Sequence, residues 1–566
     1  MKAYYEKRTV SDIKDLLYSS EKLFADNTAF LHKKNPNSIY EKITYLEFKN
    51  DVDALGTALI SLGLKDAPIA VMGENRYEWD VSYLAVVCGT GKVVPIDKEL
   101  PGNEIINLLN RSKAKAIIYS GKKHKEIQNA IEQCSHVQFF INMDSEKDEE
   151  KIISYSKLLQ QGYESVRNGN RYFIDAAIDP EAPLIMLFTS GTTSNSKAVL
   201  LNHRNIVSNI MNMCKVIYAD ENDVFLSFLP LHHTYECTCN FLTPLYLGAK
   251  IAFADGLRYI SKNLQEAGVT VLITVPLLLE GVYWKIIKNV EKQGKTTVFN
   301  IASAVNSILL KLGINISDKL FKDIYAAMGG KLRLVIAGAA ALDPIVAKGF
   351  SKLGIQCIQG YGLTECSPIA TVESDKHHLF GSTGLPLPGT EIKIKNKNED
   401  GIGEICIKSP SIMVGYLDPK DNKAAFDEEG YFRTGDLGYF DKKGFLFISG
   451  RKKNVIVTKN GKNIFPEELE SLLCACSLVK ECLVYGAIDE ITGDETVAVK
   501  IVPDIEYIAT EFPQGLSEQE LTTMLNNEVK KVNKSVVSYK AVKKVVIQQT
   551  EFQKTTTHKI KRYLET

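Results

Sequence analysis

Short apolar runs alternate with helix-like segments through about the first 370 residues of this 566-residue chain, and this alternation limits its fold more than any other feature. The runs are typical of buried strands, because they are short, rich in Val, Ile and Leu, and bounded by turn residues. Among them are "APIAVMG", "KAIIYS", "PLIMLF", "VTVLITV" and "LRLVIAG". Buried strands that alternate with helices predict stacked α/β layers with largely parallel sheets.

The sequence pattern changes twice in the remainder of the chain. From about residue 381 it is β-rich and punctuated by glycine, as in "GYFRTGDLGYFDKKGFLFISG", and from about residue 451 helices and strands alternate again. A chain of this length exceeds what one hydrophobic core usually serves. We therefore predict a large N-terminal domain over residues 1–449, made of two α/β subdomains and the β-rich part, and a small, mobile α+β domain over residues 450–566.

The composition narrows the class of protein. Lys and Arg together number 68, as do Asp and Glu, so no overall field attracts nucleic acid or an anionic membrane, and we expect no nucleic-acid partner. No apolar run reaches the roughly 18 residues of a membrane span. The 11 cysteines are scattered, as in proteins of reducing compartments. We expect a cytoplasmic enzyme, while contact with the inner face of a membrane and the oligomeric state stay open.

A stretch that follows one predicted strand has the composition of a phosphate site. The sequence "LFTSGTTSNSK", Leu187–Lys197, combines hydroxyls, a glycine and a final lysine. Small residues let backbone N–H groups approach an anion, and the lysine supplies charge. The nucleotide-loop pattern G-x-x-x-x-G-K-[ST] would require glycine at Ser196 and a hydroxyl at Ala198. The sequence therefore predicts phosphate binding by a different kind of loop, whose metal ligand lies elsewhere.

Four further stretches stand out along the chain. They are "YGLTE" (361–365), "YFRTGD" (431–436), "GRKKNVIVTKNGKNIFPEELE" (450–470) and "TTTHKIKR" (555–562). Each alone fits an ordinary turn, helix cap or solvated surface. Together with the loop, and in this order, they resemble the adenylate-forming superfamily of acyl-CoA synthetases, peptide-synthetase adenylation domains and luciferases. The resemblance covers nearly the whole chain.

The resemblance assigns the loop to the β- and γ-phosphates of ATP. The loop residues that it implies as ligands are Thr189, Ser190, Gly191, Thr192, Thr193 and Lys197. Ser194 and Ser196 stand where the family has glycine and proline, and both changes remove the backbone properties that those residues give the loop. The resemblance further implies that Glu365, helped by Thr189, holds Mg²⁺. Carboxylate, hydroxyl, phosphate and water oxygens suit this cation.

The resemblance also assigns the rest of the nucleotide site. Tyr361 is expected to stack on adenine, and Thr364 to contact the α-phosphate. Asp436 is expected to accept both ribose hydroxyls, which a carboxylate can do at once, and Arg451 to support that ribose. The implied set also contains the glycines around the tyrosine and a segment that lines the adenine and the acyl carbonyl: Gly338, Ala339, Ala340, Gly360 and Gly362.

The C-terminal tail carries the expected catalytic lysine. By resemblance, Lys559 bridges the acid's carboxylate and the α-phosphate during adenylation, a task that suits a point charge on a flexible stem. Lys554 and Lys561 are weaker rivals for this role, and His558 is taken as an incidental neighbour. Lys453 occupies the family's hinge position.

The stretch "LPLHHTYE" (229–236) carries the most information about the acid substrate. His233 and Glu236 match the H-x-x-E pair of long-chain ligases, whose histidine lies at the acyl site, whereas His232 packs or faces solvent. A satisfied structural histidine pair is the alternative. A long segment, about residues 277–330, also points to the long-chain group. Its apolar face fits either ordinary helix packing or an entry path from a membrane.

The resemblance as a whole implies a two-step reaction. A long-chain fatty acid and ATP first give an acyl-adenylate and pyrophosphate, and coenzyme A then displaces AMP to give acyl-CoA. No protein nucleophile is required, because the adenylate is itself the activated intermediate. Two alternatives stay open: transfer to the phosphopantetheine of a carrier protein, and a non-catalytic regulator that binds a nucleotide or an acyl group.

Overall fold

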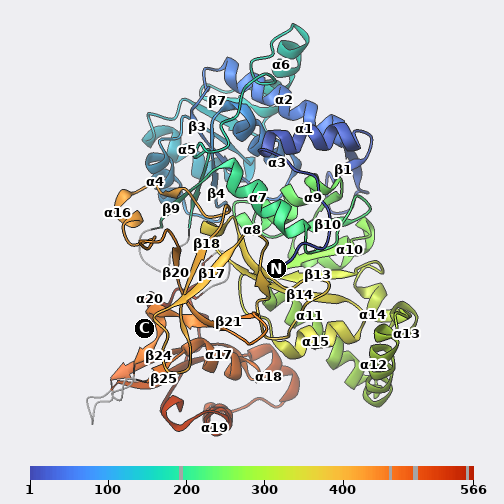
Figure 1. The fold of residues 1–566 in the computed structure, drawn as a ribbon, viewed down its shortest axis with the longest axis vertical. Helices are drawn as coiled ribbons and strands as arrows, with labels where there is room; N and C mark the ends of the chain where they lie inside the picture. Colours follow the sequence, from blue (N-terminus) through green and yellow to red (C-terminus); the bar gives the residue numbers. More distant parts are fainter. Residues whose placement is uncertain (190–195, 458–461, 489–494, 556–559, 566) are drawn as a thin grey trace. The chain divides into compact units, whose positions relative to one another are not determined.

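The protein folds into two compact units, shown as a ribbon in Figure 1. The computed structural model describes residues 1–189, 196–457, 462–488, 495–555 and 560–565. The first unit contains residues 1–189, 197–391 and 408–424, and the second contains residues 392–407 and 425–566. Part of the β-rich region thus groups with the C-terminal unit. The domain boundary between residues 449 and 450 stays a prediction.

A nine-stranded sheet forms one half of the first unit, in the order β16-β15-β14-β13-β12-β10-β11-β1-β2. In that order its strands are Leu385–Pro386, Ile369–Val372, Gln356–Gly362, Leu334–Ala337, Val271–Thr274, Val224–Ser227, Lys250–Phe253, Thr28–His32 and Glu41–Thr44. The six strands from β14 to β1 pair in parallel, whereas β15, β16 and β2 pair antiparallel at the margins. The parallel strands therefore all end at one edge.

An eight-stranded sheet forms the other half, in the order β19-β9-β8-β4-β3-β5-β6-β7. In that order its strands are Gly415–Tyr416, Ala198–Leu201, Ile185–Phe188, Lys92–Ile96, Pro68–Met72, Ala116–Tyr119, Phe139–Asn142 and Ile152–Ser154. The strands from β8 to β7 are parallel. β9 turns back antiparallel onto β8, and β19 pairs antiparallel with β9.

Helices cover both sheets of the first unit. They are α1 (Ile13–Phe24), α2 (Tyr45–Ser61), α3 (Tyr77–Ala85), α4 (Gly102–Ser112), α5 (His124–Gln133), α6 (Tyr155–Arg167), α7 (His203–Cys214), α8 (Thr234–Glu236), α9 (Thr243–Leu247), α10 (Ile260–Ala267), α11 (Pro276–Lys292), α12 (Thr296–Lys311), α13 (Ser317–Leu320), α14 (Lys322–Ala327), α15 (Pro344–Lys352) and α16 (Pro419–Asn422). The starts of two helices follow from local sequence. Thr44 with Glu47 caps α2, and Asn202 with Asn205 caps α7, each by reciprocal side-chain and backbone bonds.

Apolar alternation in the sequence explains where the cores form. All four residues of β12 and of β5 are buried, as expected for strands covered on both faces. One core packs the nine-stranded sheet against α10, α11 and α15, and another packs the eight-stranded sheet against α4 and α5. The large region therefore has the predicted α/β fold.

The second unit contains the β-rich part and a small α+β portion. A four-stranded sheet has the order β17-β18-β20-β21, with strands Glu391–Lys395, Gly403–Lys408, Phe432–Phe440 and Leu446–Arg451. The remaining elements are β22 (Ile456–Val457), β23 (Asn463–Ile464), α17 (Pro466–Cys474), β24 (Val479–Ile488), β25 (Glu495–Pro503), α18 (Ile505–Glu511), α19 (Glu518–Ser535), β26 (Lys544–Ile547) and α20 (Arg562–Glu565). β24, β25 and β26 form a sheet whose core includes α17 and α19. In the described part of the chain, no helix is both long enough and apolar enough to cross a membrane.

Candidate active site

The carboxyl edge of the nine-stranded sheet gathers several predicted site residues. β13 ends directly before Gly338, and β14 ends at Gly362, directly after Tyr361. β10 ends shortly before the segment that carries His233. Ligands of parallel α/β sheets bind at this edge, outside the carboxyl ends of the strands. The structure thus brings the predicted adenine-side residues and the predicted acyl-site histidine to one edge of one sheet.

Tyr235, which the sequence analysis missed, occupies the space beside Gly338. Its hydroxyl donates hydrogen bonds to the carbonyl oxygens of Ile336 at 3.1 Å and Thr274 at 3.3 Å, on β13 and β12. A Cβ atom added at Gly338 would lie 2.7 Å from the tyrosine ring, so the ring's close approach requires glycine there. The sequence feature that could have pointed to Tyr235 is its position as an aromatic residue between the histidine and the glutamate of "HTYE".

The next two predicted residues, Ala339 and Ala340, are exposed at this edge. Ala339 has a φ of 70°, in the left-handed region that L residues other than glycine rarely adopt. Strained backbone of this kind concentrates at ligand sites, where the surrounding structure holds it in place. The geometry therefore supports the segment as a binding element.

The motif "YGLTE" folds into the end of β14 and a 3₁₀ turn. A Cβ atom at Gly362 would collide with the carbonyl oxygen of Pro368, which also accepts a 2.9 Å hydrogen bond from the backbone N–H of Leu363. The turn covers Thr364–Cys366 and presents Glu365 as a partly exposed side chain. Glycine at this point is thus required by packing, whatever the ligand.

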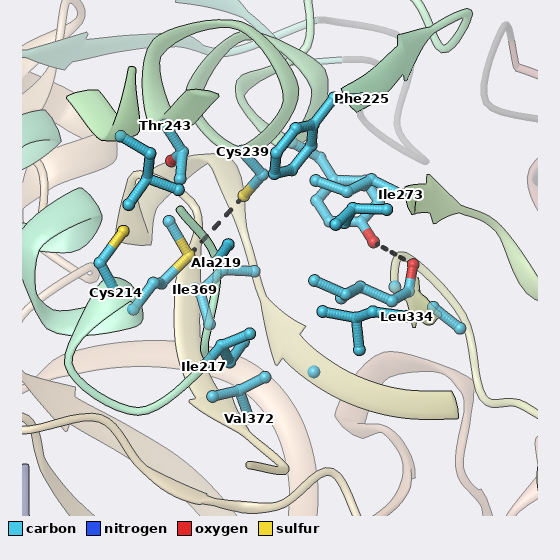
Figure 2. A pocket seen from close by; sticks show the side chains of 18 residues that line it. Cys214, Ile217, Ala219, Phe225, Cys239, Thr243, Ile273, Leu334, Ile369 and Val372 are labelled. Carbon is cyan, nitrogen blue, oxygen red and sulfur yellow. Dashed lines mark hydrogen bonds between the residues drawn. The ribbon is translucent and has the colours of Figure 1, made fainter. Parts of the chain in front are cut away.

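An apolar cavity borders Gly338 (Figure 2). Its volume is about 50 Å³, with further space that is open to solvent. It is lined by Met213, Cys214, Ile217, Ala219, Phe225, Tyr235, Cys239, Thr243, Leu247, Val271, Ile273, Leu334, Ile336, Ala337, Gly338, Gly360, Ile369 and Val372. Figure 2 shows Phe225 and Leu334 on the strand side, and Cys214 and Thr243 on the helical side. A lining of hydrocarbon and thiol groups with few polar atoms suits an apolar ligand.

The two adjacent histidines differ in their surroundings. The rings of His232 and His233 lie 4.1 Å apart between centroids. Burial lowers the pKa of His232 to about 3, so its imidazole is neutral at physiological pH, and its Nε2 atom lies 3.5 Å from a carboxylate oxygen of Asp97. His232 therefore packs inside the protein, as one of the two sequence-based expectations held. The acyl-site role of His233 stays a prediction.

Glu236 is fully buried and anchors the histidine segment to β10. Its Oε1 atom accepts hydrogen bonds from Ser227 Oγ at 2.7 Å, from Asn240 Nδ2 at 2.9 Å and from Asn75 Nδ2 at 3.3 Å. Burial raises the pKa of this carboxyl to about 8, although these hydrogen bonds oppose the shift. Glu236 is therefore largely neutral at pH 7 and acts as a structural group in this segment.

We expect the substitution Glu236→Gln to change the pH dependence of stability. In the unfolded chain the carboxyl ionises near its ordinary pKa of about 4.5, whereas in the fold it keeps its proton to about pH 8. The raised pKa therefore stabilises the fold fully below pH 4.5, and this contribution is lost as the pH rises to 8. Because glutamine stays neutral, the variant should match the wild type near pH 5 and be more stable at pH 8 by roughly 1–4 kcal/mol. Urea unfolding of both proteins at both pH values measures this. The same difference in unfolding free energy between variant and wild type at pH 5 and at pH 8 would contradict the prediction.

The phosphate loop connects two antiparallel strands. β8 and β9 pair in the register Phe188 with Ala198, so the loop returns to a strand and not to a helix N-terminus. The backbone N–H of Thr189 donates a 2.9 Å hydrogen bond to the carbonyl of Lys197, and the Thr189 hydroxyl donates to the same oxygen at 3.3 Å. The predicted ligands Ser190, Gly191, Thr192 and Thr193, and the altered position Ser194, lie outside the described residues.

Tyr416 contacts both the loop lysine, Lys197, and the predicted metal ligand, Glu365. β19 pairs with β9 and places Tyr416 beside the loop. The Lys197 ammonium lies 4.5 Å from the Tyr416 ring centroid, and the Tyr416 hydroxyl donates a 2.8 Å hydrogen bond to Glu365. The same ammonium lies 3.2 Å from a carboxylate oxygen of Asp421. The structure thus brings Lys197 and Glu365 together, and it adds Tyr416 and Asp421, which the sequence analysis did not name.

We expect Asp421→Asn to lower the apparent KM for ATP. The Lys197–Asp421 pair is partly exposed, so it contributes at most about 1 kcal/mol, and phosphate must compete with it for the lysine. Removing this competitor should lower KM by about two- to fivefold, and the gain should shrink at high salt. Steady-state kinetics at two ionic strengths checks this, with Glu221→Gln as a charge-matched control at an exposed position. A raised KM would show that Asp421 instead supports the site.

The predicted ribose carboxylate forms an ion pair inside the second unit. Asp436 on β20 faces Arg451 at the end of β21 in the strand register, and their side chains lie 2.8 Å apart. Asp436 is 5% exposed. The structure therefore places the two predicted ribose residues side by side, and their role in ribose binding stays a prediction. Lys453, the predicted hinge, lies in a 3₁₀ turn over Lys452–Asn454.

The C-terminal tail is held on both sides of the predicted catalytic lysine. Lys559 and His558 lie outside the described residues. Before them, Lys554 pairs with Glu481 at 2.7 Å and with Glu551 at 3.0 Å. After them, Arg562 donates to the carboxylate of Glu470 at 2.6 Å and to the carbonyl of Val484 at 2.9 Å. Lys554 is thus occupied by carboxylates, which weakens its claim as a rival to Lys559.

Comparisons with solved structures show the same architecture. The crystal structure of the anthranilate CoA ligase AuaEII in complex with anthranoyl-AMP matches with a TM-score of 0.76 at 18% identity, covering 100% of this chain and 97% of that one. A fatty acyl CoA synthetase of Mycobacterium tuberculosis matches with a TM-score of 0.66 at 22% identity, covering 98% and 97%. These likenesses confirm the predicted fold class.

Sequence comparisons identify relatives over most of the chain. Long-chain-fatty-acid–CoA ligase 1 of Cavia porcellus is 29% identical over 86% of this chain and 73% of the relative. Long chain acyl-CoA synthetase 6, peroxisomal, of Arabidopsis thaliana is 29% identical over 92% and 76%. Long-chain-fatty-acid–CoA ligase 6 of Rattus norvegicus is 30% identical over 80% and 69%.

Family models match both parts of the chain. The model described as the C-terminal domain of AMP-binding enzymes matches residues 468–559. The model of the AMP-binding enzymes themselves matches residues 20–417, well over half of the chain. With the residues that gather at the sheet edge and around the loop, this match shows that the chain belongs to the AMP-binding enzyme family.

Proposed function

We propose that this protein is a long-chain fatty-acid–CoA ligase that forms AMP. The observation that carries the proposal is the apolar cavity, which borders Gly338 at the carboxyl edge of the nine-stranded sheet. A hydrocarbon chain in this cavity would place its carboxyl group toward the segment predicted to line the acyl carbonyl. The names of the relatives agree with this substrate class.

The residues around the loop fit Mg²⁺ as the metal of the nucleotide. Among the described residues no group of three or more His, Cys, Asp or Glu side chains could hold an ion. Glu365 offers one carboxylate, with the Tyr416 hydroxyl hydrogen-bonded to it, and Thr189 offers a hydroxyl. Mg²⁺ commonly takes one or two protein oxygens and completes its shell with phosphate and water. When bound, it would neutralise charge on the phosphates.

The roles of the chain's own residues follow from their chemistry. Lys197 supplies a cation to the phosphates, and Asp436 is a buried carboxylate suited to a pair of ribose hydroxyls. The fatty-acid carboxylate attacks the α-phosphorus, and pyrophosphate leaves. Lys559 offsets the charge that develops on the oxygens in this step. The thiol of coenzyme A then attacks the acyl carbonyl, and AMP leaves with the oxygen that the acid contributed.

The protein's cysteines support a reducing compartment. All eleven cysteines are free, and most of them are buried. Free buried thiols are usual in the cytoplasm, where disulfides do not persist. We place the enzyme there, with peripheral contact to the inner face of a membrane.

A carrier-protein phosphopantetheine is the alternative acceptor, since it ends in the same thiol as coenzyme A. One assay tests both the activity and the acceptor. The protein should release pyrophosphate with ATP, magnesium and acids of increasing chain length, and form acyl-CoA when coenzyme A is present. Pyrophosphate release without acyl-CoA formation would favour a carrier protein. No release with any acid would favour the non-catalytic regulator and overturn the proposal.

A further inference from the structure

Helix α12 carries a stripe of apolar side chains that faces solvent. The exposed apolar residues and their exposed fractions are Val298 (67%), Ile301 (60%), Val305 (44%), Ile308 (59%) and Leu312 (69%). Their spacing of three and four residues puts them on one face, as a stripe roughly 20 Å long. The buried residues of the helix are Ser303 and Asn306. The half-buried Phe299 packs on the same inner side, with its ring 5.8 Å from that of the buried Phe321. The stripe itself stays outside this packing, and a membrane role for it stays a prediction.

Hydrogen bonds on the polar side hold the helix in this orientation. The amide of Asn306 donates to Ser317 Oγ at 2.9 Å and to the carbonyl of Lys352 at 2.9 Å, and Ser317 Oγ donates back to Asn306 Oδ1 at 3.1 Å. Rotating the stripe inward would leave these buried polar groups unpaired, at a large cost. The exposure of the stripe is therefore built into the fold.

The surroundings of the stripe are strongly basic. Between Lys285 and Lys322 the chain has seven lysines and two acidic residues, a surplus of five positive charges, whereas the whole chain is neutral. Six of these lysines are exposed and make no ion pair with the described part of the chain: Lys285, Lys292, Lys295, Lys311, Lys319 and Lys322. The exposed Trp284 on neighbouring α11 adds an aromatic side chain of the kind enriched at membrane interfaces. The local charge thus complements an anionic surface.

We propose that α12 docks on the surface of an anionic phospholipid bilayer, with its apolar stripe in the interface and the lysines against the headgroups. Amphipathic helices with basic flanks bind in this way, by apolar burial and by attraction to anionic lipid. A second copy of the chain fits less well, because two such surfaces would bring like charges together. The benefit of such docking rests on the proposed function. A long-chain acid dissolves in the bilayer, and an enzyme bound there would take up its substrate directly from the lipid.

Vesicle flotation of the full chain, without ATP, acid or coenzyme A, tests the proposal. The wild type should float with vesicles of phosphatidylglycerol and phosphatidylcholine, and bind pure phosphatidylcholine vesicles at least about tenfold more weakly. The double variant Ile301→Gln/Ile308→Gln should lose at least about tenfold in binding. Binding should also fall as salt is raised.

The control is Leu23→Gln/Leu257→Gln, which alters two apolar residues that are each 60% exposed elsewhere in the first unit. It should bind vesicles like the wild type. The proposal would be overturned if the wild type bound anionic and neutral vesicles equally well. It would also be overturned if the stripe variant bound anionic vesicles as well as the control does. A wild-type dimer that the stripe variant converts to monomers without any vesicle binding would likewise overturn it, because the stripe would then serve a second copy.

The same variants separate this inference from the proposed function. With acid dispersed in detergent, stripe and control variants should form acyl-CoA at equal rates. With acid presented in anionic vesicles, only the stripe variant should be slower, by about the factor lost in flotation. Flotation without acyl-CoA formation would refute the proposed function and leave the docking surface in place.

Discussion

The variant Lys559→Ala should lose adenylation by about 10²–10³-fold, yet convert a synthetic acyl-adenylate to acyl-CoA at nearly the wild-type rate. The lysine's charge is needed while the α-phosphorus takes on a fifth oxygen, where one fixed cation contributes roughly 3–4 kcal/mol. In the second step AMP only departs, so the same charge is no longer required. Pyrophosphate release measures the first half-reaction, and thioester formation from the synthetic adenylate measures the second.

Lys554→Ala is the matched control for this prediction. Lys554 lies on the same tail, but its ammonium already pairs with Glu481 at 2.7 Å and Glu551 at 3.0 Å. This variant should therefore change adenylation by no more than a few-fold, the scale of partly exposed ion pairs. Equal losses of both half-reactions in Lys559→Ala, or a larger loss in Lys554→Ala, would contradict the assignment.

Glu365→Gln should reduce adenylation by at least about 100-fold and raise the magnesium concentration needed for half-maximal rate. Glu365 is the predicted metal ligand, and an amide is a much poorer ligand for a hard cation than a carboxylate. Adenylation rates across a magnesium titration measure both effects.

Tyr416→Phe provides the comparison for Glu365→Gln. It keeps the ring beneath Lys197 and removes only the 2.8 Å hydrogen bond to Glu365, so the expected loss is about tenfold or less. If Glu365→Gln behaved like Tyr416→Phe, with an unchanged magnesium dependence, the metal would be held by other groups.

The α/β fold and the order of the motifs follow from local sequence. Strands such as β12 are apolar throughout, and helices such as α7 begin at capping residues that the sequence displays. Asp436 and Arg451 could each be picked out from recognisable motifs, whereas their ion pair depends on the register of β20 with β21. Local sequence patterns were therefore enough to predict those features whose physical cause is local.

Other parts of the site depend on contacts between distant segments. Tyr235 hydrogen-bonds to Ile336, 101 residues away, so its packing against Gly338 has no local signal. Asp421 reaches Lys197 because β19 pairs with β9. Such contacts are set by the packing of segments that are distant in the chain, which cannot be read from a single sequence.

The orientation of α12 shows a second limit. Helical spacing revealed an apolar face between residues 277 and 330, but periodicity does not tell whether that face meets protein or solvent. In the structure the amide of Asn306 anchors the opposite side of α12 to the protein, which leaves the stripe exposed. A buried polar anchor of this kind can be recognised only once its partners are known.

Oxygen transfer from the acid to AMP tests the central claim most directly. The protein is incubated with ATP, magnesium, coenzyme A and a long-chain acid labelled with ¹⁸O in its carboxyl group, and the products are weighed by mass spectrometry. If the carboxylate attacks the α-phosphorus, AMP gains one labelled oxygen and pyrophosphate gains none. Label in inorganic phosphate, with ADP in place of AMP, would mean attack at the γ-phosphorus and would contradict the account.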